Sequence, residues 1–127
     1  MRAHVPTMAA AMPFDPALLF REFGDEALVR DLARLLIETT PPQVDAVEAA
    51  VRSGDAAALR AAAHRLRGSI VTFGVPAAVE TARKLEEMGA AGDLDGADVL
   101  SRQLAADVQL LCESAAAWLE SGAPLPS

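Results

Sequence analysis

The stretch that decides the fold runs from Asp55 to Gly74 and reads DAAALRAAAHRLRGSIVTFG. An aspartate that can cap a helix opens it, and a glycine followed by Val75-Pro76 closes it. These start and stop signals predict a single helix. Apolar residues recur in it at steps of three or four, so they share one buried face: Leu59, Ala63, Leu66, Ile70 and Phe73.

His64 and Gly68 lie away from that face. At about 100° per residue, His64 is roughly 140° from the middle of the apolar stripe and Gly68 is almost opposite it. Ala57 and Ala61 share the same outer surface. A glycine inside a helix costs about 1 kcal/mol relative to alanine, and a site that admits another protein to the imidazole would explain that cost. Arg67, one turn after the histidine, can place a cation beside an anion on the ring.

The run Ala63-His64-Arg65-Leu66-Arg67-Gly68-Ser69, followed by Phe73-Gly74, resembles the phosphorylation helix of histidine phosphotransfer (HPt) domains. The family pattern is approximately A-H-x-L-K-G-S, then several residues and Leu/Phe-Gly. Only this segment is diagnostic, although the implied architecture extends over residues 15–121. The sequence departs from the pattern at Arg67, where the family usually has lysine. Charge is kept, but a planar guanidinium replaces a compact ammonium.

The resemblance implies a role for each residue of the motif. His64 is the phosphoacceptor, Arg67 contacts the phosphoryl oxygens, Gly68 gives a partner access, and Ser69 forms a hydrogen bond nearby. The implied partners are receiver domains of response regulators or a hybrid histidine kinase. The receiver supplies the aspartyl phosphate and a divalent metal ion, so we expect no cofactor and no metal site in this chain. We expect the docking residues to be Arg60, Arg65, Val71 and Lys84.

The chemistry of imidazole suits such a carrier. A solvated imidazole, with an ordinary pKa near 6.5, is largely neutral at cytoplasmic pH and is a competent nucleophile toward phosphorus without a dedicated base. The phosphoramidate that it forms is energetic enough to be passed on. The sequence has no GxxxxGK[ST] loop and no protein-kinase motif set. We therefore expect a phosphocarrier with a phosphohistidine intermediate and no ATP-dependent kinase activity.

Composition limits the other possibilities. The 127 residues are enough for one domain, alanine is abundant, and aromatic residues make up only 4%, which suits closely packed helices. The net charge of −7 disfavours nucleic acid as a partner, although six basic and only two acidic side chains lie between Arg52 and Lys84. No apolar run approaches the roughly 18 residues of a membrane span. Cys112 is the only cysteine and is interpreted as a small buried hydrophobe. We expect a cytoplasmic monomer.

The remaining chain predicts an all-α fold, an antiparallel four-helix bundle with a short extra N-terminal helix. We assign residues 1–13, with a solvated His4, to a flexible tail, residues 14–122 to the bundle, and residues 123–127 to a C-terminal tail. Asp15-Pro16 starts a short helix that ends at Gly24. We expect this helix to cover one end of the core. The last helix carries the longest apolar stripe: Leu100, Leu104, Val108, Leu111, Ala115 and Trp118.

Two helices need further comment. Asp25 caps a helix with an apolar stripe of Leu28, Leu32, Leu35 and Leu36, but past Pro41-Pro42 the stripe is displaced by roughly 100°. We predict one long helix with a sharp kink there. A full break stays open, because Thr40 and Gln43 have the spacing of a capping box, which marks the start of a helix. A helix from Pro76 is predicted to end at Gly89, with residues 90–96 as a connector, and Glu86-Glu87 is interpreted as its solvated end.

Two alternatives to a phosphocarrier stay open. The first is an interaction module that docks on a receiver or kinase and inhibits or scaffolds without carrying phosphate; the departure at Arg67 leaves room for it. The second is the dimerising, histidine-bearing domain of a kinase, which is weaker because the bundle closes within one chain. The sequence identifies neither the cognate partner nor the direction of phosphate flow.

Overall fold

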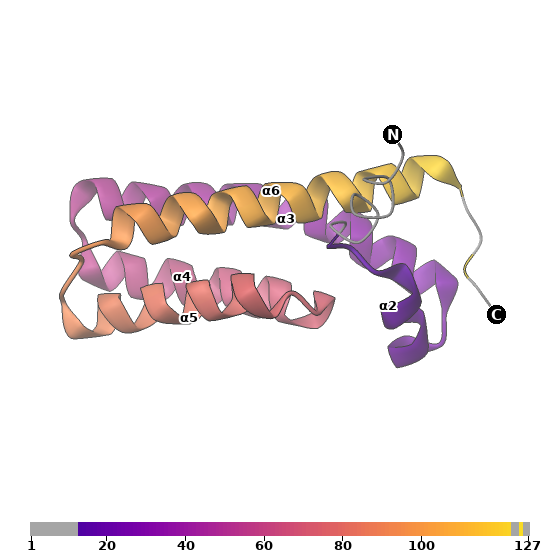
Figure 1. Ribbon diagram of the computed structural model, residues 1–127, viewed down its shortest axis with the longest axis horizontal. Helices are drawn as coiled ribbons and strands as arrows, with labels where there is room; N and C mark the ends of the chain where they lie inside the picture. The colour runs from indigo at the N-terminus through magenta and orange to yellow at the C-terminus, as the bar shows by residue number, and fades with distance from the viewer. Residues whose placement is uncertain (1–12, 123–124, 126–127) are drawn as a thin grey trace, which may run out of the picture.

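A computed structural model describes residues 13–122 and Leu125, and in this part of the chain all regular structure is helical. The helices are α2 (Pro16–Phe23), α3 (Glu26–Ser53), α4 (Ala56–Ile70), α5 (Pro76–Ala91) and α6 (Ala97–Ser121), with a short 3₁₀ turn, η1 (Val71–Phe73), after α4 (Figure 1). The predicted class, a helical bundle with a short N-terminal helix, is confirmed. His4 and nearly all of both predicted tails lie outside the described residues.

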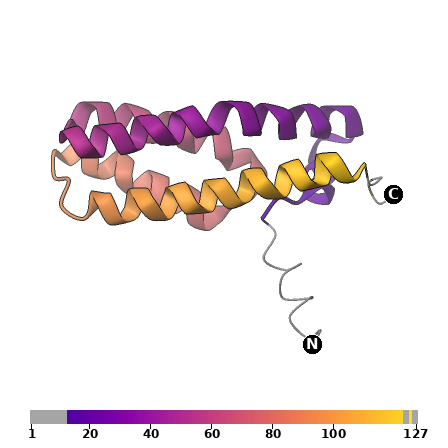
Figure 2. The ribbon, with the colours of Figure 1, turned by 90° about the horizontal axis from the view of Figure 1, so that it is seen from above.

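Short connections make consecutive helices antiparallel neighbours. α4 packs against α3 and α5, and α6 packs against α5 and returns to α3, so the four long helices enclose one core. Figure 2 shows α3 and α6 running along one another. These two helices extend beyond the ends of α4 and α5, and α2 lies in the space left there (Figure 1).

The short helix α2 covers one end of the core, as predicted. Leu19 of α2 is buried, and just before α2 the Phe14 ring lies 6.2 Å from that of Phe73 and 5.5 Å from that of Trp118, measured between centroids. Gly74 has a φ of 66°, and a Cβ built on it would lie 2.7 Å from a methyl carbon of Leu18. Gly74 therefore combines a left-handed backbone with close contact to α2, two reasons for glycine there.

Aspartate side chains begin three of the helices, each at the position that the sequence predicts. Asp15, Asp25 and Asp55 accept hydrogen bonds from backbone N–H groups three residues later, at 3.1, 3.3 and 3.0 Å. Each bond satisfies a donor that has no partner inside its helix. The start of α4, and with it the rotation of its side chains, is therefore defined locally by Asp55.

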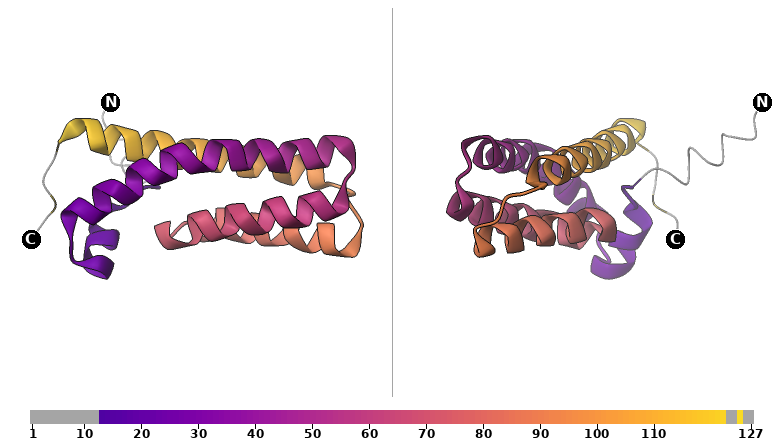
Figure 3. Two further views of the ribbon diagram at one scale, coloured as in Figure 1. Left: turned by 180° about the vertical axis from the view of Figure 1, so that it is seen from behind. Right: turned by 60° about the vertical axis from the view of Figure 1, so that its left-hand side comes forward.

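The helix α3 continues through Pro41 and Pro42 without a break. Its axis changes direction along its length (Figure 3), as expected where two prolines remove backbone donors and crowd the preceding turn. Thr40 does not act as an N-cap, because its hydroxyl donates to the Leu36 carbonyl at 2.7 Å. The same hydroxyl lies 3.1 Å from Sγ of Cys112 on α6, so the bend is tied to the neighbouring helix. Burial raises the pKa of the half-buried Cys112 thiol.

The predicted stripe on the first half of α3 is partly wrong. Leu36 is buried and Leu32 partly buried, but Leu28 is exposed and Leu35 is 57% exposed. The side chains that enter the core there are small or β-branched instead: Val29, Ala33 and Thr40. The cause is the close packing of α3, which accepts alanine and threonine inside and leaves two leucines on the surface.

The predicted ends of α4 and α5 also need correction. α4 ends at Ile70, and the chain reaches Gly74 through η1 rather than as one uniform helix. α5 does not end at Gly89 but runs to Ala91, and Gly92, with φ of 74°, is its C-cap. Gly89 is a buried glycine inside the helix, packed against the backbone of α4. The connector to α6 is therefore shorter than the predicted 90–96.

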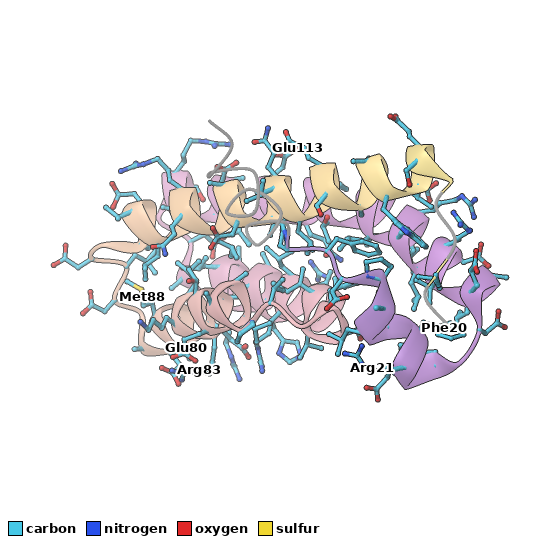
Figure 4. All side chains as sticks on the ribbon, turned by 45° about the vertical axis from the view of Figure 1, so that its right-hand side comes forward. Phe20, Arg21, Glu80, Arg83, Met88 and Glu113 are labelled. Atoms are coloured by element: carbon cyan, nitrogen blue, oxygen red, sulfur yellow. The ribbon has the colours of Figure 1, made fainter. Side chains whose placement is uncertain are left out.

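The outer face of α5 is highly charged. Arg83 pairs with both Glu80 and Glu87, and Figure 4 shows Glu80 and Arg83 together on this outer surface. These bonds lower the pKa of Glu80 and raise that of Arg83. None of the helices in residues 13–122 combines the length and the apolar character that crossing a bilayer requires.

Candidate functional site

His64 lies on the side of α4 that faces away from the core. The opposite side of the helix is fully buried, and the His64 side chain is 67% exposed. The phase of the apolar residues therefore predicts its orientation correctly. The buried residues that hold α4 in this rotation are Leu59, Ala63, Leu66 and Ile70.

Glu86 on α5 joins His64 to Arg67. Its Oε2 lies 3.0 Å from Nδ1 of His64. Its Oε1 accepts a hydrogen bond from Nε of Arg67 at 3.0 Å and forms an ion pair with Nη2 of the same residue at 2.8 Å. Nη2 of Arg67 also lies 3.4 Å from Nδ1 of His64. We call His64, Arg67 and Glu86 the His64 cluster; because Nδ1 is occupied, Nε2 is the ring nitrogen available to an incoming group.

The charge of Glu86 is set by two opposing effects. Burial alone raises the pKa of this carboxyl, whose side chain is 20% exposed. Hydrogen bonds from Arg67 and His64, together with the positive charge of Arg67, outweigh burial and bring the pKa below its ordinary value. Glu86 is therefore a carboxylate at neutral pH, and a carboxylate can only accept hydrogen bonds.

The interpretation of Glu86 as part of a solvated helix end was wrong, and sequence reasoning missed its contact with His64. A signal was present in the spacing, because Ala82, Glu86 and Gly89 follow one another at i, i+4 and i+7. Ala82 and Gly89 are buried, so the residue between them also faces a neighbouring helix. The spacing does not say which helix Glu86 faces, because that depends on how α4 packs on α5.

Gly68 lies one turn after His64 and borders open space. A Cβ built on it would meet no atom within 4 Å, so the fold itself does not require glycine there. Ser69 does not contact the imidazole; its hydroxyl donates to the Arg65 carbonyl at 3.3 Å, within the same helix. The surface beside the ring is thus bare backbone at Gly68.

Two grooves flank His64. One lies between α4 and α5 beside the imidazole and has a floor of small residues bordered by two charged ones; it is lined by Ala57, Arg60, Ala61, Glu86, Gly89 and Ala90. The other lies between α3 and the end of α4 and is mostly apolar; it is lined by Leu32, Leu35, Leu36, Gly68, Thr72 and Phe73. Exposed Leu35 borders this second groove, and Val71, 55% exposed, follows directly on α4.

The predicted docking residues do not all lie together. Arg60 and Arg65 are exposed on α4 on either side of His64 in the sequence. Lys84 lines a different groove, beside Asp95 and Leu100 near the start of α6. Within the described ranges, no three His, Cys, Asp or Glu side chains gather as ligands of a metal ion would.

Comparison with known proteins agrees with this geometry. The family model described as Hpt domain matches residues 31–118, which include α4 and the whole His64 cluster. Two curated relatives, the virulence sensor protein BvgS of Bordetella bronchiseptica and that of Bordetella parapertussis, are each 36% identical over 99 residues. The match covers 76% of this chain but only 8% of each relative. No solved structure matches the chain significantly.

Proposed function

The chain belongs to the Hpt domain family, and on that premise we propose that His64 accepts a phosphoryl group from an aspartyl phosphate of a receiver domain and passes it to another receiver. One observation carries the proposal. An exposed imidazole is held at Nδ1 by Glu86, beside the cation of Arg67 and the uncovered backbone of Gly68. This arrangement leaves Nε2 free to react and gives a large partner access to it.

The transfer needs little from this chain beyond that geometry. The lone pair of Nε2 attacks phosphorus, and the aspartate leaves with the electron pair of the broken P–O bond. A divalent metal ion held by the receiver would supply the positive charge that neutralises the phosphoryl oxygens. Arg67, 3.4 Å from the ring, lies close enough to contact one of these oxygens afterwards. We assign no part in the transfer to Ser69, whose hydroxyl is used within α4.

We propose that the receiver docks over the groove between α3 and α4. This groove is lined by Gly68 and by the exposed apolar side chain of Leu35, and exposed Val71 directly follows α4 at that end. Arg60, which lines the groove between α4 and α5, and Arg65 are both exposed on α4. These positive charges favour a partner whose rim is acidic. A docked receiver would bury apolar surface at the centre and pair charges at the edge, the usual anatomy of a transient interface. A single copy of the chain, in the cytoplasm, is sufficient for this reaction.

The experiment is a transfer assay with a panel of purified receiver domains, each phosphorylated on aspartate with a radiolabelled acyl phosphate. Label should move to the chain and be lost in acid, as expected of phosphohistidine. His64→Gln should abolish labelling, because it removes the nucleophile, without changing helicity by circular dichroism.

Two results would contradict the proposal. Labelling that persists in His64→Gln would place the acceptor elsewhere. Receiver binding without any label on the wild-type chain would favour a scaffold or inhibitor that docks on the same surface without carrying phosphate.

A further inference from the structure

We propose that Thr40 is a positioning residue for receiver docking: its hydroxyl, in contact with α6, fixes the bend of α3 and thereby the width of the groove between α3 and α4. The inference rests on the proposed function, because it concerns the groove over which the receiver is proposed to dock. It also gives a role in docking to Cys112 of α6, which lines a separate groove between α3 and α6.

One wall of the docking groove comes from the part of α3 that precedes its two prolines. The described residues of α3 that line it are Leu32, Leu35, Leu36, Thr39 and Thr40. The opposite wall is formed by the end of α4 and by η1. The part of α3 after the prolines is joined to α4 by the short turn at Gly54, and its Val47 and Ala50 are buried. The angle at the prolines therefore determines how far one wall lies from the other.

The backbone of α3 does not fix this angle by itself. The two prolines carry no N–H, so the carbonyls four residues before them, on Ile37 and Glu38, lose their partners within the helix. The hydroxyl of Thr40 donates to the Leu36 carbonyl at 2.7 Å, and such a bond within a helix favours bending. Three consecutive carbonyls thus depart from the regular pattern, and a helix weakened in this way needs an external contact to hold one angle.

The helix α6 supplies that contact through Thr40, which is completely buried. Because the hydroxyl hydrogen is used by Leu36, the hydroxyl oxygen is left to accept from the thiol of Cys112, whose Sγ lies 3.1 Å away. A second contact joins the same half of α3 to α6: the guanidinium carbon of Arg30 lies 4.6 Å from the centroid of the Trp118 ring. The wall of the docking groove is therefore attached to α6, near the start of α3 and at its bend.

The wall positioned in this way carries the apolar surface proposed to meet the receiver. Leu35, 57% exposed, lines the groove opposite Gly68, which lies one turn after His64. A different angle at the bend would move Leu35 relative to Gly68 without altering the contacts of the His64 cluster. We therefore expect the bend to affect the binding of the receiver and not the chemical step at Nε2.

The test compares three substitutions with a matched control. Thr40→Val removes the hydroxyl and keeps the shape, Cys112→Ala removes its partner on α6, and Thr40→Ser keeps the hydroxyl. The control is Thr81→Val, because Thr81 is also buried and its hydroxyl donates to the carbonyl four residues earlier, on Ala77, at 3.0 Å. Thr81 lies on α5, which contributes none of the described residues that line the docking groove.

The first readout is the angle between residues 26–39 and residues 43–53 of α3, measured in solution from residual dipolar couplings of the backbone N–H groups. This measurement requires no receiver. We expect the angle to change in Thr40→Val and in Cys112→Ala by more than the difference between wild type and Thr81→Val. Thr40→Ser should retain the wild-type angle, because it keeps the hydroxyl.

The second readout is the rate at which the chain takes label from a phosphorylated receiver as the receiver concentration is varied. Thr40→Val and Cys112→Ala should raise the KM for the receiver about fivefold and leave the maximal rate unchanged, as expected of residues that act without touching the partner. Thr40→Ser and Thr81→Val should keep the wild-type KM. Loading of His64 by a small phosphoramidate should be equal in all of them.

Three results would overturn the inference. One is a wild-type angle in Thr40→Val or in Cys112→Ala, and another is a changed angle with a wild-type KM. The third is an equal rise of the KM in Thr81→Val, which would indicate a general loosening of the bundle. A wild-type chain that takes no label from any receiver would contradict the proposed function instead, while the dipolar couplings would still decide whether Thr40 and Cys112 fix the bend.

Discussion

Two glycines lie inside the helices that carry the His64 cluster, and their surroundings are opposite. A Cβ on Gly89 would lie 2.5 Å from the backbone nitrogen of Arg60 and 2.7 Å from the carbonyl oxygen of Ala56. A Cβ on Gly68 would meet nothing within 4 Å. The first glycine lets two helix backbones approach each other, and the second leaves a surface bare. Both lack the side chain that a stable isolated helix favours.

The difference separates a structural requirement from a functional one. Gly89 allows α5 to approach α4 closely enough for Glu86, three residues earlier, to reach His64 and Arg67. Gly68 gives the fold no comparable contact, so its helix-weakening effect is not offset by packing within the chain. A residue that the fold does not need, next to an exposed imidazole, is best explained by a molecule that must approach that imidazole.

The largest effect should come from alanine at the buried glycine. Gly89→Ala gains helix propensity but forces the α4 and α5 backbones apart, and overpacking of this kind costs about 1–3 kcal/mol. We expect a net loss of about 2 kcal/mol in the free energy of unfolding, measured by urea titration followed by circular dichroism. Gly68→Ala is the matched control and should stabilise the protein by up to about 1 kcal/mol.

If Gly89→Ala and Gly68→Ala changed the free energy of unfolding in the same direction, the contrast between the two glycines would be contradicted. If both destabilised the protein, Gly68 would have a packing role that its open surroundings do not explain. If both stabilised it, α4 and α5 would tolerate separation, and the contact between Glu86 and His64 would not depend on Gly89.

The second prediction concerns a large side chain at the open glycine. Gly68→Gln should fold at least as stably as wild type, because glutamine is a far better helix former than glycine. It should nevertheless slow phosphotransfer from a receiver by about tenfold, equivalent to about 1.4 kcal/mol in the barrier, because the side chain separates the partner from Nε2. Transfer from a small phosphoramidate should change little, and a similar loss with both donors would place the damage in His64 itself.

The sequence predicts the fold class and the exposure of His64 because both depend on local features. Asp55 defines the start of α4, and a regular apolar stripe sets its rotation, so the outward face follows from one helix alone. The same reasoning was wrong for Gly89, since a glycine late in a helix resembles a C-cap. Only the approach of a second backbone shows that it is an interior residue.

The contact of Glu86 with His64 was missed for a related reason. A glutamate near the end of a helix is usually solvated, and neither its spacing nor its charge identifies which helix it will face. The first half of α3 shows the same limit, because close packing there admitted small side chains and left Leu28 and Leu35 exposed against the predicted stripe. The sequence therefore predicted features within single helices, but it did not determine the contacts between one helix and another.

The smallest predicted effect extends the comparison from glycines to a matched pair of valines. Val71, after α4, and Val99, on α6, are 55% and 56% exposed, so neither contributes much to the core. If the groove between α3 and α4 is the docking surface, Val71→Glu should slow transfer from a receiver by about fivefold, or roughly 1 kcal/mol, whereas Val99→Glu should leave it unchanged. Both variants should unfold at the wild-type urea concentration. Equal losses in the two would indicate a general effect of added negative charge on an already acidic chain, and a loss in Val99→Glu alone would move the docking surface to the side of the bundle formed by α6.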